Sequence, residues 1–231
     1  MIDFAFLIEI LPKLLSGLPL TLQLAAISIT LGFFLALSLA FALQLKSPFL
    51  SLPIRGFVAL FRGTPLLVQI FLIYYGLGQF RPGLQAIGLW GFFREPYWCA
   101  ILALSLNTAA YGSEILRGAI QSVPRELVDA ARALGMRPFL TWRLVILPMA
   151  FRQAIPSYGN EIILMVKGTS LASIVTLMEV TGIAHGLISE TYRAIEVFIC
   201  AGAIYLTINF IIIRTLAGLE YWLSPHLRGA P

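Results

Sequence analysis

The sequence predicts an all-α membrane protein, built as a bundle of about five transmembrane helices. Hydrophobic residues make up 59% of its 231 residues and charged residues only 12%, whereas a soluble domain is about half apolar and about a quarter charged. Several apolar runs reach the roughly 20 residues that cross a bilayer core. The net charge of +5 then reflects basic residues that hold cytoplasmic loops in place, and no binding to nucleic acid is expected.

The first two elements are an N-terminal segment and a long apolar run. Residues 1–17 carry Asp3 near their start and lack a basic leading region, so they predict a short interfacial helix and not a cleavable signal. Residues 18–43 contain no charged side chain and are long enough to span a bilayer. A polar turn with Lys46, Arg55 and two prolines follows, and it separates the first span from the second.

The next two spans are predicted on either side of a loop. The second span covers about 57–78. Residues 79–96 are rich in glycine, proline and aromatic side chains, a composition typical of an extramembrane loop with interfacial anchors. The third span runs from Tyr97 to near Gly118.

The region 149–195 is too long for one crossing and too apolar for an ordinary loop. It predicts a fourth span that ends near Gly168, then a short, partly inserted helix over 170–182, and then a polar segment. The fifth span covers about 196–218. A sixth span results if the short helix crosses completely.

Basic residues set the orientation. Six arginines lie within residues 117–152, namely Arg117, Arg125, Arg132, Arg137, Arg143 and Arg152. Six arginines at the bilayer centre would cost on the order of 15 kcal/mol or more, since each costs about 2.5–3.5 kcal/mol on insertion scales. This stretch is therefore predicted to be cytoplasmic, which places the N-terminus outside and the C-terminus inside. The same topology puts these basic residues on the cytoplasmic side: Lys46, Arg55, Arg62, Arg214 and Arg228.

The cytoplasmic loop has a predicted helix of its own, over about 124–134. Pro124 suits the first turn of a helix, Gly135 suits the left-handed residue that follows the last turn, and Pro138 prevents continuation. The helix carries an apolar face. These residues alone leave open whether that face packs on the protein's own spans or on another protein.

The stretch "DAARALGMRPFLTWRLVILP" resembles the loop motif of binding-protein-dependent ABC importer permeases. In that family the motif reads Glu-Ala-Ala, three residues, Gly, nine residues, and then Ile-x-Leu-Pro. The matching residues here are Asp129, Ala130, Ala131, Gly135, Val145, Leu147 and Pro148. The exchanges of Asp for Glu and Val for Ile keep the acidic charge and the β-branched shape. Four further segments resemble the polar amino acid branch of the family, which includes histidine, lysine–arginine–ornithine and octopine–nopaline permeases: "FRGTPLLVQIFLIYYGLGQF", "LNTAAYGSEILRGAIQSVP", "NEIILMVKGTSLASIV" and "ISETYRAIEVFICAGAIYL".

The resemblance implies a type I ABC importer permease fold in a bacterial inner membrane. It implies a single transmembrane domain over 1–231, with its core at about 17–218 and a coupling loop at about 119–148. The loop helix is then a coupling helix that docks on a dimer of cytosolic ATPase subunits. The other implied partners are a periplasmic or extracellular substrate-binding protein and a second permease subunit, with a sister chain favoured over a second copy.

Catalysis is not expected in this chain. It contains no Gly-x-x-x-x-Gly-Lys-Ser/Thr phosphate loop, so ATP and Mg²⁺ are assigned to the partner subunit, and the chain alone is not predicted to be an enzyme. The two histidines lack a ligand pattern, and no metal site is predicted. Cys99 and Cys200 either pair near the outer membrane face or act as small packing residues.

Polar residues inside the spans are candidates for a substrate path, because they are costly to bury in a bilayer. The candidates are Asn107, Glu114, Asn160, Glu161, Lys167, Thr169 and Ser170. Two alternatives stay open: Glu114 pairs with Arg117 one turn away, and the polar residues near Glu161 pair between helices. The segment "KGTSL" suggests a broken helix whose new N-terminus faces an anionic group.

A second candidate feature is a helix breaker beside a charge near the inner end of the second span. It consists of Arg62, Gly63, Thr64 and Pro65. This segment predicts a hinge or gate, or alternatively an interfacial anchor.

Together these features predict the permease subunit of an ATP-driven importer for polar amino acids. The resemblance to the histidine, lysine–arginine–ornithine and octopine–nopaline permeases implies a basic amino acid or an opine. The net charge of −1 that Glu114, Glu161 and Lys167 give the intramembrane set points the same way. The alternatives are an ion-coupled secondary transporter that uses the two glutamates, and a membrane-embedded enzyme or assembly factor. A secondary transporter does not explain the docking loop, and the sequence shows no convincing internal repeat. No carboxylate pair, His/Cys cluster or nucleophile–base arrangement supports an enzyme or assembly factor.

Overall fold

The computed structural model describes residues 3–45 and 47–223, so the predicted placement of Lys46 and Arg228 lies outside the described residues. The described part is helical and contains no strand. Its elements are α1 (Phe4–Leu15), α2 (Leu18–Gln44), α3 (Pro48–Gly63), α4 (Leu66–Phe71), η1 (Leu72–Gly76), α5 (Arg81–Ala86), α6 (Trp90–Phe93), α7 (Pro96–Gln121), α8 (Arg125–Ala133), α9 (Pro138–Thr141), η2 (Trp142–Ile146), α10 (Leu147–Gly168), η3 (Thr169–Val175), α11 (Val180–Thr191) and α12 (Ala194–Leu223). The π-helical turns η1 and η2 each continue a neighbouring α-helix, and η3 is a 3₁₀ turn.

The helices agree with the predicted bundle of about five spans. Three of them, α2, α7 and α12, are long and apolar enough to cross a membrane alone. Two bent pairs raise the number to as many as five: α3 with α4–η1, bent by 109°, and the helix from α9 to η3 with α11, bent by 48°. If each bent pair forms one span, the described part has three continuous spans and two interrupted ones.

Two predicted elements are wrong in detail. The second span was expected over about 57–78, but α3 begins earlier, at Pro48, and the chain turns sharply after Gly63. Proline at the first helical position is favourable because its missing N–H would be unpaired there anyway. The short helix expected over 170–182 is instead the 3₁₀ turn η3, a break, and the start of α11.

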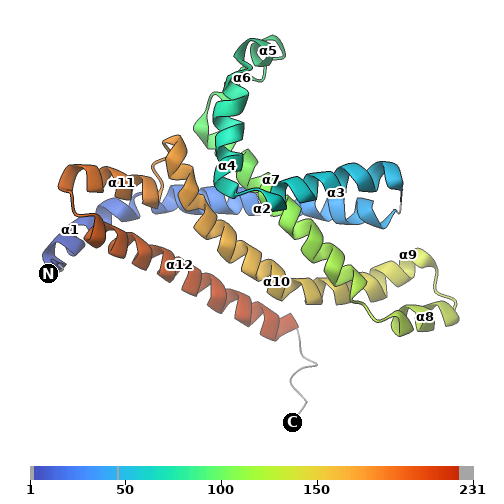
Figure 1. Ribbon diagram of the computed structural model, residues 1–231. Helices are drawn as coiled ribbons and strands as arrows, with labels where there is room; N and C mark the ends of the chain where they lie inside the picture. The colour runs from blue at the N-terminus through green and yellow to red at the C-terminus, as the bar shows by residue number, and fades with distance from the viewer. Residues whose placement is uncertain (1–2, 46, 224–231) are drawn as a thin grey trace.

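The helix α7 lies at the centre of the fold, along α2 and against α10 (Figure 1). Its buried surface is rich in small residues, among them Ala100, Ala103 and Ala109, which are fully buried. On the facing helix, a Cβ added to Gly32 of α2 would lie only 2.6 Å from the Cβ of Thr108. Small residues let membrane helices approach closely, and this accounts for the tight α2–α7 contact.

The break before α11 is held by a carboxylate that sequence analysis did not select. Glu179 is fully buried and accepts hydrogen bonds from the backbone N–H of Thr181 and of Gly182, at 3.0 and 2.9 Å. The hydroxyl of Tyr205 on α12 donates to the same carboxylate at 2.7 Å. A Cβ on Gly17 would lie 2.7 Å from the backbone of Glu179. The side chain thus ties α11 to α12 beside the start of α2.

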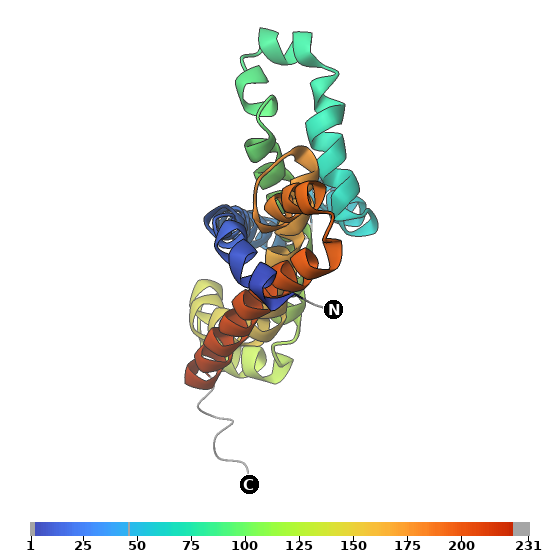
Figure 2. The same ribbon diagram turned by 90° about the vertical axis from the view of Figure 1, so that its left-hand side faces the viewer.

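The predicted loop helix is present as α8, and Gly135 adopts the expected left-handed conformation, with φ of +74°. The N–H of Gly135 donates to the carbonyl of Arg132 at 2.9 Å, and the N–H of Met136 donates to the carbonyl of Ala131 at 3.1 Å. Pro138 begins α9. The α8–α9 pair lies at the opposite end of the molecule from the projecting α5–α6 segment (Figure 2).

Candidate functional site

The site begins at the break between α3 and α4, where the sequence reads Arg-Gly-Thr-Pro. A residue before proline is pushed toward extended backbone, and Thr64 has φ of −119° and ψ of 145°. Pro65 has no N–H to continue the hydrogen-bond ladder. The helix therefore ends at Gly63, and α4 leaves at 109° to α3.

The end of α3 exposes carbonyl groups that have no partner within the helix, and side chains satisfy them. The Thr64 hydroxyl donates to the carbonyl of Leu60 at 2.8 Å. The amide nitrogen of Gln69 donates to the carbonyl of Phe61 at 2.7 Å. The hydroxyl of Tyr111, on α7, donates to the carbonyl of Arg62 at 3.4 Å, a longer contact. Non-helical backbone at membrane depth is tolerated where protein groups satisfy it in this way.

Beside this break lies a cavity of about 260 Å³. Residues from the break, from α7 and from α10 line it: Thr64, Pro65, Leu66, Asn107, Tyr111, Glu161, Leu164 and Met165. The cavity brings together two predicted substrate-path residues, Asn107 and Glu161, and two predicted hinge residues, Thr64 and Pro65. Thr64 thus lines the same cavity as Asn107, 43 residues later in the sequence, and as Glu161, 97 residues later.

Glu161 is the only carboxylate among the lining residues, and no lysine or arginine lines the cavity. Its residue is 6% exposed. No basic side chain among the described residues lies within 4.0 Å of its oxygens, although ion pairs form elsewhere in the fold. A buried carboxylate without a partner is costly. The arrangement is therefore suited to a guest that brings a positive charge.

The remaining predicted path residues do not line this cavity. Glu114 accepts from the guanidinium of Arg117 at 3.0 Å and lies 4.0 Å from that of Arg62, so the alternative of local pairing is confirmed. Asn160 and Lys167 are exposed. The hydroxyls of Thr169 and Ser170 donate to carbonyls of the preceding turn, each at 2.7 Å.

Arg62, the first residue of the predicted hinge, lies at the edge of the site. Its guanidinium sits 5.3 Å from the centre of the Tyr111 ring, a cation–π contact. The side chain is about half exposed, and its pairing with Glu114 is at the limit of an ion pair. Gly63 has open space around it. Neither residue reaches the cavity lining.

Gln69 is a residue that sequence analysis missed. It holds the break and also accepts from the amide of Asn107 at 2.9 Å. A lone glutamine inside an apolar run, four residues after the proline of a helix break, is the signal that marks it. Its partners could not be read from spacing, because one of them lies on another helix.

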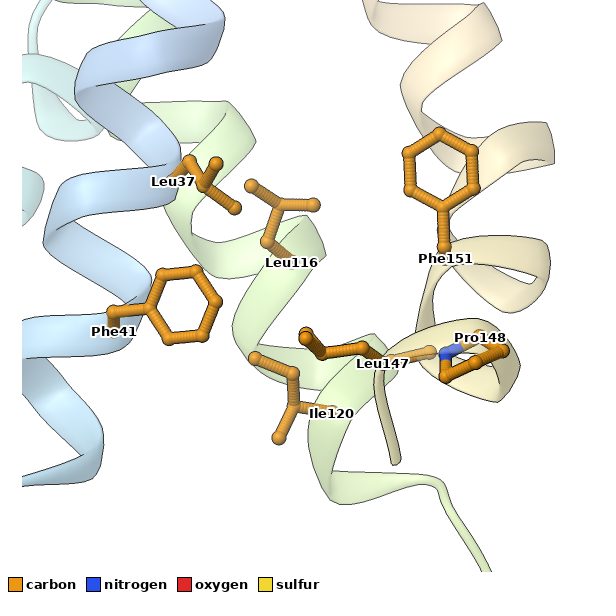
Figure 3. Close-up of a pocket in the computed structure, with 8 residues that line it drawn as sticks. Leu37, Phe41, Leu116, Ile120, Leu147, Pro148 and Phe151 are labelled. Atoms are coloured by element: carbon orange, nitrogen blue, oxygen red, sulfur yellow. The ribbon is translucent and has the colours of Figure 1, made fainter. Parts of the chain in front are cut away.

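A larger hollow of about 500 Å³ lies between α2, α7 and α10 (Figure 3). Its lining is wholly apolar and includes Phe41, Leu116 and Phe151, together with Leu147 and Pro148 of the loop motif. A charged or zwitterionic guest would lose its hydration there without compensation. The smaller polar cavity is therefore the better candidate for a substrate site.

The loop motif divides into two parts in space. Asp129, Ala130 and Ala131 lie on α8, and Gly135 ends it. Val145 lies in η2, and Leu147 and Pro148 begin α10, where they face the apolar groove of the spans. On α8, Leu127 is 43% exposed and the following Leu134 is 82% exposed. The apolar face of α8 is thus only partly covered: Ala131 is buried and Val128 packs against the core, whereas the two leucines stay exposed.

The two cysteines are both buried and free. The alternative of a disulfide between Cys99 and Cys200 is therefore wrong, and they act as packing residues. Among residues 3–45 and 47–223, no cluster of three or more potential metal ligands occurs.

The chain is similar in sequence to one protein family and to individual permeases. Residues 28–224 match the family described as binding-protein-dependent transport system inner membrane component. The chain is 54% identical over 226 residues to the nopaline transport system permease protein NocM of Agrobacterium fabrum, covering 98% of this chain and 94% of that protein. It is 57% identical over 226 residues to the octopine transport system permease protein OccM of Rhizobium meliloti, covering 98% and 92%.

A solved structure agrees with these relationships. The fold superposes on a chain of an amino acid ABC transporter crystallised with histidines, with a TM-score of 0.85 and 33% identity. The match covers 95% of this chain and 98% of that chain.

Proposed function

The chain belongs to the family of binding-protein-dependent transport system inner membrane components, and from this premise we propose that it carries an arginine-derived opine or a basic amino acid through the Glu161 cavity. It is a multi-pass permease subunit of an ABC importer, and it is not itself an enzyme, because the ATPase is a separate subunit. Membership in this family argues against the two alternatives, a secondary transporter and a membrane-embedded enzyme.

One observation carries the substrate proposal: a buried carboxylate without a basic partner lines a polar cavity beside a broken span. A cationic side chain would offset the cost of that charge, whereas an acidic side chain would add to it. The relatives named for nopaline and octopine point the same way. Both opines are conjugates of arginine and keep its guanidinium group, which presents several N–H donors in one plane.

The partners follow in part from the family, since an ABC importer permease works with an ATPase subunit and a substrate-binding protein. We propose that α8 is the surface that docks on the ATPase dimer. The exposed apolar side chains of Leu127, on α8, and of Leu134, directly after it, support this role. The second permease in the complex is proposed to be a sister chain, and ATP and Mg²⁺ belong to the ATPase subunit.

We also propose that residues 119–148 and the C-terminus face the cytoplasm and that the N-terminus faces outward. The six arginines around α8 and the positive-inside rule support this orientation. The separation of α5–α6 from α8–α9 is consistent with it (Figure 2). A cysteine at position 85 should react with a membrane-impermeant reagent in intact spheroplasts, whereas one at position 128 should not. Labelling at 128 and not at 85 would reverse the topology.

The substrate proposal is tested by Glu161→Gln in the reconstituted complex with its ATPase and binding protein. Losing the charge while keeping the shape should weaken stimulation of ATP hydrolysis by octopine or arginine about 10-fold or more, because hydrogen bonds to charged groups contribute about 1.5–3 kcal/mol. Asn160→Ala, on the same helix but exposed, is the matched control and should behave like the wild type. Unchanged stimulation of Glu161→Gln, or stimulation by glutamate or leucine alone, would refute the proposal.

A further inference from the structure

Gln69 lies behind the wall of the cavity, yet it contacts both the helix break and a residue that lines the cavity. We infer that Gln69 is a positioning residue: it fixes the side-chain amide of Asn107 so that the carbonyl oxygen of that amide faces the cavity and accepts N–H donors of a cationic guest. The inference rests on the proposed function, because it assumes that the substrate binds in this cavity.

The orientation of the Gln69 amide is determined by its neighbours. Its Nε2 lies 2.7 Å from the carbonyl oxygen of Phe61 and 3.0 Å from both the carbonyl oxygen and the hydroxyl oxygen of Thr64. The carbonyl oxygens can only accept, and the hydroxyl proton of Thr64 is already donated to Leu60. A reversed amide would place Oε1 against three acceptors. The NH₂ group must therefore face the break.

This constraint passes to Asn107. The Oε1 of Gln69 can only accept, so the group that approaches it at 2.9 Å must be the NH₂ of Asn107. Both residues are buried, at 5% and 7% exposure. The amide of Asn107 thus has one allowed orientation, which the hydrogen-bond network sets independently of any guest.

The remaining oxygen of Asn107 is then an acceptor in the cavity. Asn107 lines the cavity with Glu161, and its Oδ1 has no hydrogen-bond partner among the described residues. An acceptor oxygen and a carboxylate together match a guanidinium, which has five donors and no acceptor. If the Asn107 amide were reversed, its NH₂ group would face the N–H groups of the guanidinium, and no hydrogen bond could form. Gln69 therefore links two features: it hydrogen-bonds the open carbonyls at the α3–α4 break, and it sets which atom of Asn107 faces the cavity.

The test measures direct binding of radiolabelled arginine and radiolabelled citrulline to the assembled permease–ATPase complex without its binding protein. Citrulline has nearly the same shape as arginine but an uncharged side chain. Gln69→Leu removes the network, and it is expected to weaken arginine binding about 10-fold and to lower the arginine-to-citrulline affinity ratio, since a net hydrogen bond to a charged group contributes at least that factor. Gln153→Leu, exposed on α10, is the matched control.

The decisive variant is Asn107→Asp. It keeps an acceptor for the guest and adds a negative charge, but it cannot donate to Gln69 when ionised. The inference predicts that arginine binding weakens about 10-fold in this variant as well, because the ionised carboxylate is repelled by the Oε1 of Gln69 and its oxygens leave the position that accepts from the guest, while the exposed Asn160→Asp has no effect. Arginine binding by Asn107→Asp that equals or exceeds the wild type would overturn the inference.

A double variant separates positioning from general packing. If Gln69 acts through Asn107, then Gln69→Leu combined with Asn107→Leu should bind arginine no more weakly than Asn107→Leu alone, because coupled residues are not additive. Additive losses would overturn the inference. Failure of the proposed function is distinguishable, since Glu161→Gln would then leave arginine binding unchanged.

Discussion

Two helix ends in this protein are sealed in different ways. At the α3–α4 break, the free carbonyls accept from the side chains of Thr64, Gln69 and Tyr111, and the last two belong to other elements. At the end of α8, the backbone N–H groups of Gly135 and Met136 donate to the last turn of the same helix. The break depends on side chains from other elements, whereas the end of α8 is closed by backbone hydrogen bonds to its own last turn.

The difference follows from the surroundings of each helix end. At membrane depth no water satisfies an open carbonyl, so the break requires side chains aimed at it. The loop has six arginines around it and lies outside the predicted spans, where a left-handed glycine is sufficient. The first arrangement couples the break to the site, and the second closes the end of α8 without side chains from another element.

The largest expected effect is at the break. Gln69→Leu leaves the carbonyls of Phe61 and Thr64 without their donor, and each unpaired buried group costs about 1–3 kcal/mol. We expect the free energy of unfolding of the complex to fall by about 2 kcal/mol or more, seen as a lower Tm by differential scanning fluorimetry. An unchanged Tm, equal to that of Gln153→Leu, would show that the break seals itself.

A smaller effect is expected at the loop. Any side chain at Gly135 is strained at φ of +74°, by about 1 kcal/mol for alanine and more for valine. Gly135→Val should insert and assemble normally but reduce transport and coupled ATP hydrolysis. Gly118→Ala, at a glycine with open space and no positive φ, is the control. Full transport by Gly135→Val would contradict a coupling role for this turn.

The smallest effect is expected at Tyr111. Its hydroxyl contact with the Arg62 carbonyl is long, at 3.4 Å, so Tyr111→Phe should lower the free energy of unfolding by about 0.5 kcal/mol. The ring that stacks with Arg62 is retained. A loss of Tm as large as that of Gln69→Leu would mean that Tyr111, and not Gln69, holds the break.

Continuous apolar runs made the long helices predictable. The helix α2 occupies Leu18–Gln44, and residues 18–43 were expected; α8 and its left-handed Gly135 followed from local signals alone. The start of α3 at Pro48 was missed because two prolines and a charge in that segment are typical of a turn. The break after η3 was missed because Thr176, which is not a glycine, takes the left-handed conformation there. The next helix is capped at its start by Glu179, whose partners include the distant Tyr205.

The candidate site was predictable only as a collection of residue types. Asn107 and Glu161 stood out because polar groups in apolar runs are costly, yet Lys167 and Asn160 stood out equally and are exposed. The bend at Pro65 and the packing of α7 against α10 determine which of these polar residues line one cavity. Gln69 acts through hydrogen bonds to groups up to 38 residues away, and no local pattern contains that information.

The central claim is that a cationic group of the substrate binds at Glu161, and a structure of the complex tests it most directly. Electron cryo-microscopy of the permease–ATPase complex trapped with octopine should show the guanidinium of the ligand within hydrogen-bond distance of Glu161, with the Oδ1 of Asn107 turned toward it. A ligand whose guanidinium lies outside this cavity, or whose carboxylates face Glu161, would contradict the account.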